Sequence, residues 1–141
     1  MRTKVSLLIR KPVNEVFEAF INPEITTRFW FSKSSGKLVQ GEKVTWEWEM
    51  YGVTDEIYVQ EIVPNERIHI QAKNLQETIF RFTPFSDTET VVEIDNGEFE
   101  TLEEIIDTTE GYTLVLSGLK AVLEHDLNLH LIEDKHPDAR V

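Results

Sequence analysis

Acidic and histidine side chains at helical spacing are the residues of this sequence that could do chemistry. Asp126 and His130 lie four residues apart near the end of the chain, and Glu133 and His136 lie three apart. On a helix either pair could bind one metal ion, but such pairs are common as ion pairs on acidic helices. We therefore expect no metal site. With no phosphate-binding glycine loop, His-Glu-x-x-His motif or Gly-x-Ser-x-Gly elbow, the sequence nominates no catalytic residue and no cofactor.

One acid, Glu61, alternates with apolar residues along its predicted strand. It shares a strand face with Ile57 and Val59, so it could point into the interior and act as an acid or base. The alternative is an ion pair with Arg67 or Arg81 at the rim, and this is the interpretation we favour.

Aromatic side chains gather on shared faces of the predicted elements. Trp46 and Trp48 lie two residues apart in an alternating stretch, as do Phe80 and Phe82, so the members of each pair project to one side. Tightly packed core is one interpretation. The other is a ligand cavity between a curved sheet and a helix, since Trp and Tyr often line pockets. The candidate ligand-binding residues are Trp30, Trp46, Trp48, Phe80, Phe82, Tyr112 and Leu116.

The strands and helices that position these side chains can be predicted from the periodic spacing of apolar residues and from the turn residues between them. Strands are predicted over 3–10, 44–50, 53–63, 67–73, 78–83 and 90–96, with Pro84 ending the fifth. Two short helices follow the first strand, and Asn22 caps the second of them. A long last helix is predicted over 103–131, with a capping box at its start, and the tail over 136–141 is predicted to be frayed. Its sheet-facing residues are predicted to be Tyr112, Leu116, Leu119 and Leu123.

Composition narrows the class of protein. The 141 residues suit one domain over 1–141, and the net charge of −12 argues against a nucleic-acid or anionic-membrane partner. The absence of cysteine excludes disulfides and thiolate chemistry. No secretory signal or stretch of about 20 apolar residues is present, so we expect a cytoplasmic protein.

Several short motifs, in order over about residues 3–125, resemble one known family. The first helix begins with Pro12-Val13, the second helix segment ends in Trp30-Phe31, Gly111-Tyr112 stands where the family usually has Gly-Trp, and residues 119–124 match its Leu-Lys-x-x-Leu-Glu ending. Asn96 stands where a His is common. The sequence resembles the START-like (SRPBCC, birch-pollen-allergen-like) superfamily, and within it the family of the C-terminal domain of the activator of the heat-shock-protein-ninety ATPase.

This resemblance implies an α+β helix-grip fold. A curved antiparallel sheet of six or seven strands would wrap around a long C-terminal helix, with two short helices after the first strand. It also implies a hydrophobic cavity that binds a small apolar or aromatic molecule or a lipid, rather than an enzyme. The alternatives are a cavity enzyme of polyketide cyclase or hydrolase type and a chaperone-interacting protein. A chaperone or homodimer contact has no support in the residue pattern, and no role is predicted for residues 125–141.

Overall fold

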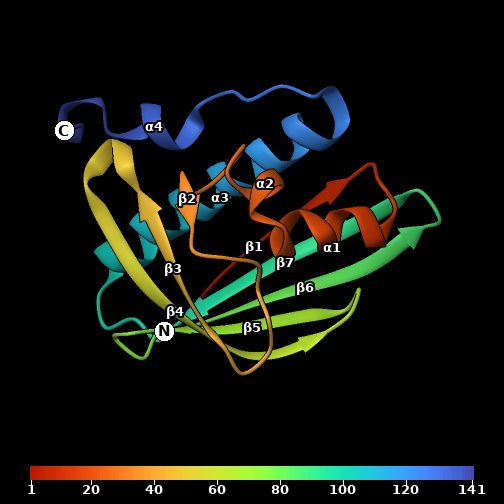
Figure 1. Cartoon of the computed structure of the whole chain (residues 1–141), viewed down its shortest axis with the longest axis horizontal. Helices are drawn as coiled ribbons and strands as arrows, with labels where there is room; N and C mark the ends of the chain where they lie inside the picture. The colour runs from red at the N-terminus through yellow and green to blue at the C-terminus, as the bar shows by residue number, and fades with distance from the viewer.

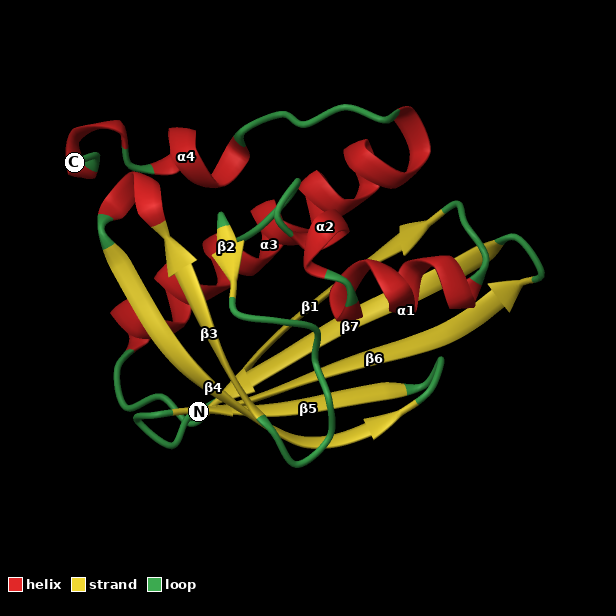
Figure 2. Ribbon diagram, viewed as in Figure 1, coloured by secondary structure: helices red, strands yellow, loops and turns green.

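Seven antiparallel strands form one curved sheet in the computed structural model, which describes all residues from 1 to 141 (Figures 1 and 2). The strand order is β1-β7-β6-β5-β4-β3-β2, so β1 and β2 are the edges. The strands are β1 (Thr3–Ile9), β2 (Lys33–Ser34), β3 (Lys43–Trp48), β4 (Val53–Val63), β5 (Arg67–Ala72), β6 (Glu77–Ser86) and β7 (Glu89–Gly97). Apart from the short β2, they lie near the predicted positions because alternating sequences bury one face and expose the other. Strand β3 ends at Trp48 instead of the predicted Met50, because Glu49–Tyr51 form a 3-10 turn.

Strand β6 does not stop at Pro84 as predicted. Pro84 pairs with Thr90, and the ladder continues to Ser86 and Glu89 after a register shift between Pro84 and Ser86. Such an irregularity suits proline, which has no N–H to donate to the ladder.

A register shift in β4 decides which way Glu61 points. Val59 pairs with Ile70 but Glu61 pairs with His69, so Gln60 is the additional residue. The extra residue moves Glu61 to the outer face. There its carboxylate accepts from Arg67 Nε at 2.9 Å and lies 2.8 Å from Arg67 Nη2. The structure therefore supports the ion-pair interpretation of Glu61.

The helices are α1 (Val13–Ile21), α2 (Pro23–Thr26), α3 (Leu102–His125) and α4 (Leu131–Lys135), with 3-10 turns at Glu49–Tyr51 and Pro137–Ala139. Asn22 caps α2 through its side chain, and the Thr101–Glu104 capping box begins α3 as predicted. Helix α3 ends six residues before the predicted 131, because Asp126 takes a left-handed conformation and its N–H bonds back to Ala121 and Val122. No helix has the length and apolar content needed to span a bilayer.

The core lies between the sheet and the helices. Helix α3 runs across the sheet, and α1 and α2 cover its other part (Figures 1 and 2). Leu116 and Leu119 of α3 are 2% and 0% exposed, and Tyr112 and Leu123 pack half-buried against the same core, which agrees with the predicted helix face. The α+β helix-grip fold predicted from the resemblance is thus the observed one.

Candidate functional site

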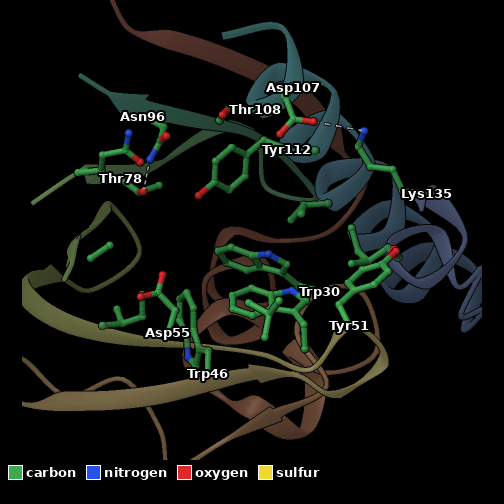
Figure 3. Close-up of a pocket in the computed structure, with 18 of the residues that line it drawn as sticks. Trp30, Trp46, Tyr51, Asp55, Thr78, Asn96, Asp107, Thr108, Tyr112 and Lys135 are labelled. Carbon is green, nitrogen blue, oxygen red and sulfur yellow. Dashed lines mark hydrogen bonds and ion pairs between the residues drawn. The ribbon is translucent and has the colours of Figure 1, made fainter. Parts of the chain in front are cut away.

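A cavity of about 610 Å³ lies between α3 and strands β3–β7 of the sheet (Figure 3). Eleven of its 21 lining residues are hydrophobic, so its wall is mainly apolar with several polar groups among them. Strands β3 to β7 supply one side, α3 supplies another, and residues 132–136 border the cavity from the C-terminal segment. The size falls in the usual range for small-molecule sites.

Four of the predicted site residues line this cavity: Trp30, Trp46, Trp48 and Tyr112. The rings of Trp30 and Trp46 are 4.9 Å apart, and those of Trp30 and Tyr112 are 5.8 Å apart. Trp46 is only 2% exposed, so it belongs to the core and to the cavity wall at once. Because the chain has three tryptophans and all three line the cavity, its intrinsic fluorescence reports on this site.

The other three predicted residues, Phe80, Phe82 and Leu116, are buried but do not line the cavity. Helix α1 places Phe17 5.5 Å from Phe82 and Phe20 5.1 Å from Phe80, measured between ring centroids. These contacts cover the inner face of β6 where it passes beneath α1. On α3 the neighbouring Val115, rather than Leu116, reaches the cavity.

Polar side chains from β4, β6, β7, α3 and the C-terminal segment also line the cavity. Asn96 of β7, the position where the family often has His, donates from Nδ2 to the Glu77 carbonyl at 3.0 Å and to the Thr78 hydroxyl. Burial raises the pKa of the Tyr112 phenol, so this group stays a neutral hydroxyl. Figure 3 shows the Tyr112 hydroxyl projecting into the space that also contains the carboxyl group of Asp55.

Asp55 is the site residue that sequence reasoning missed. It lies on β4 opposite Trp46 and lines the cavity. Burial raises the pKa of its carboxyl group, with a smaller raising effect from Glu56, and no cation is among the groups that act on it. The sequence could have predicted its inward orientation, because residues 55 and 57 lie two apart on one strand and therefore project to the same face as the inward-facing Ile57.

Residues 127–141, which we call the strap, return over the β3–β4 hairpin (Figure 1). The Tyr51 hydroxyl donates to the Ile132 carbonyl and accepts from the His136 N–H at 3.2 Å. At the end of the strap the Val141 N–H donates to the Met50 carbonyl at 3.1 Å. The tail is therefore tied to the sheet rather than frayed as predicted, and Ile132, Lys135 and His136 become part of the cavity wall.

We expect Tyr51→Phe to loosen the strap, because it removes the hydroxyl that joins the strap to the hairpin. A hydrogen bond worth about 0.5–1.5 kcal/mol would raise the population of the open strap about 2- to 10-fold. Amide hydrogen exchange of Asp134, whose N–H bonds the His130 carbonyl, measures this opening. Tyr58→Phe, at a tyrosine 40% exposed on β4, is the control, and equal protection in both variants would contradict the role of Tyr51.

Comparison with known proteins agrees with this architecture. Protein SSP2350 from Staphylococcus saprophyticus is 29% identical, with a TM-score of 0.85 over 92% of this chain and 96% of that one. The Aha1 dimer from Colwellia psychrerythraea is 17% identical, with a TM-score of 0.80 over 89% and 97%. Protein MLL2253 from Mesorhizobium loti is 17% identical, with a TM-score of 0.78 over 90% and 100%. Among curated protein sequences, none matches the chain at a significant level.

The family assignment comes from the sequence between α1 and the end of α3. Residues 10–124 match the model of the family described as Activator of Hsp90 ATPase homolog 1-like protein. The strap, with its three cavity residues, lies outside the matched residues. The chain, with its SRPBCC helix-grip fold, belongs to the Activator of Hsp90 ATPase homolog 1-like family.

Proposed function

We propose that this protein binds a small molecule with an apolar or aromatic body in the cavity beneath the strap. The observation that carries the proposal is the cavity of about 610 Å³ walled by Trp30, Trp46 and Trp48. Large aromatic surfaces that face an open volume are costly to hydrate, and a ligand of matching shape removes them from water. Polar groups of the cavity wall, such as those of Asp55, Thr78 and Asn96, would orient such a ligand.

Acid–base catalysis in the same cavity is the second candidate function. It is favoured by Asp55, a carboxyl group with a raised pKa that shares the cavity with the Tyr112 hydroxyl. Carboxyl groups of this kind act as general acids or bases when a substrate brings a proton within reach. Binding is the simpler proposal, because it needs only the cavity and its walls.

Titration with Nile red, an uncharged apolar dye, tests the binding proposal. We expect the dye to fluoresce more strongly on binding and to quench the tryptophan emission. Trp48→Leu keeps the wall apolar but removes one ring, and should weaken dye affinity about 2- to 10-fold. Trp48 is suited to this test because it is only partly buried, unlike Trp46.

The control is Phe85→Leu, at a phenylalanine 70% exposed and outside the cavity. Its dye affinity should equal that of the unsubstituted protein. Absence of dye binding would contradict the proposal. So would equal affinity in the Trp48→Leu protein with its fold intact by circular dichroism.

A further inference from the structure

We propose that the ligand is an organic cation, an aromatic or alkyl body that carries a protonated or quaternary amine. The amine would lie against the carboxylate of Asp55 and the faces of the surrounding indole and phenol rings. This inference rests on the proposed function and names the chemical class of its ligand.

The first reason is that Asp55 has no partner for its charge. No ion pair and no hydrogen bond from another side chain reaches its carboxylate, and only backbone bonding at Glu56 lowers its pKa. Partial burial in the cavity wall disfavours the charged form of this carboxyl group, which faces the cavity and not a partner group. A cationic ligand group would supply the missing partner.

The second reason is that the cavity offers no free cation to an anionic ligand. Lys135 is its one lysine or arginine. The Lys135 ammonium lies 3.0 Å from Glu110 and 3.9 Å from Asp107, and its side chain is only 16% exposed. With Asp55, three carboxylates therefore stand against one ammonium in and beside the cavity. The net charge of −12 for the whole chain adds to the attraction for a cation.

The third reason is the aromatic wall. The faces of Trp and Tyr rings carry negative electrostatic potential and attract ammonium groups within about 6 Å. Trp30, Trp46, Trp48 and Tyr112 all line the cavity. Trp46 has one face stacked on Phe31, at 4.5 Å between ring centroids, and is the cross-strand neighbour of Asp55. No arginine lines the cavity to stack on these rings. Figure 3 shows Trp30, Trp46 and Tyr112 around the space into which Asp55 points.

A pair of ligands with one shape and different charge tests the inference. Benzyltrimethylammonium carries a permanent positive charge, and neopentylbenzene replaces its nitrogen by carbon. Titrations at pH 7, followed by tryptophan fluorescence, should show the cation binding about tenfold more tightly than the hydrocarbon. Asp55→Asn should remove most of this preference by weakening the cation alone. Asp87→Asn, in the turn between β6 and β7, is the matched control and should leave both affinities unchanged.

The pH dependence of binding is measured first on the unsubstituted protein, and two variants then identify the group that titrates. The quaternary ligand does not titrate, so a pH effect comes from the protein. Asp55 shares the cavity with Asp107 and Tyr112 of α3 and with Lys135 and His136 of the strap, and Glu56 is its neighbour on β4. As pH falls through the raised pKa of Asp55, its carboxylate becomes neutral. Cation affinity should then fall while hydrocarbon affinity stays constant, and His136→Gln should retain this change whereas Asp55→Asn should abolish it.

The outcomes separate the two proposals. Equal affinities for cation and hydrocarbon, with Nile red bound, would overturn the cation inference and leave the binding function standing. Binding of Nile red without either test ligand would also overturn the inference. Failure of Nile red to bind would overturn the binding function as proposed, and the inference with it.

Discussion

Leu119→Ala should destabilise the protein by about 2–5 kcal/mol, as expected when a large buried side chain is truncated. Leu119 is 0% exposed and lies in the core beneath α3, where the neighbouring side chains cannot close a cavity of several methyl groups. Urea denaturation followed by circular dichroism measures the free energy of unfolding.

Leu102→Ala is the matched control for this prediction. Leu102 is the first residue of α3 and is 66% exposed, so its truncation should change stability by less than about 0.5 kcal/mol. A loss below about 0.5 kcal/mol in the Leu119→Ala protein would show that this face of α3 does not pack on the sheet.

Asp95→Asn should cost about 1.5–3 kcal/mol near neutral pH, the range for a hydrogen bond to a charged group. The Asp95 side chain is 8% exposed on the outer face of β7. Its carboxylate accepts from Arg2 Nε at 2.8 Å and from Arg81 Nη1 at 3.2 Å. Asparagine keeps the shape but loses the charge that both guanidinium groups require.

The cost of Asp95→Asn should disappear in acid. Burial by itself would raise the pKa of Asp95, but hydrogen bonds and charge from Arg2 and Arg81 outweigh it and lower the pKa. A lowered pKa means that the stabilisation is complete above the unfolded pKa of about 4 and is lost as pH falls through the folded pKa. Urea denaturation of both proteins from pH 7 to 3 should show their stabilities converging. Glu93→Gln, which removes the less buried partner of Arg81, is the control and should cost less. A constant difference at every pH would contradict the ion-pair explanation.

Local sequence was sufficient to predict most elements. Strand β4 has the predicted bounds of Val53–Val63, because alternating side chains between turn residues specify a strand without distant contacts. The Asn22 cap and the Thr101–Glu104 capping box were predicted for the same reason, since their hydrogen bonds join residues two or three positions apart. The predicted end of helix α3 lay too far along the chain, because apolar residues continue at helical spacing beyond Asp126, where the backbone leaves the helix.

The candidate cavity was predictable in part. Alternation correctly places Trp46 and Trp48 on one side of β3, and both line the cavity. The same alternation places Phe80 and Phe82 on the inner side of β6, but Phe20 and Phe17 of α1 cover them. A strand pattern tells which face is inside; it does not tell what packs against each point of that face.

The sequence by itself determined the succession of strands and helices along the chain and the apolar face of each. It also showed that the common catalytic motifs are absent. Only the tertiary structure decided that Glu61 lies on the outer face, because the register shift after Val59 depends on pairing with β5. It also decided that residues of the strap form part of the cavity wall. The strap is held there by the Tyr51 bonds to Ile132 and His136, which join residues more than 80 positions apart. Contacts at such separations depend on how the whole chain packs, and no local period encodes them.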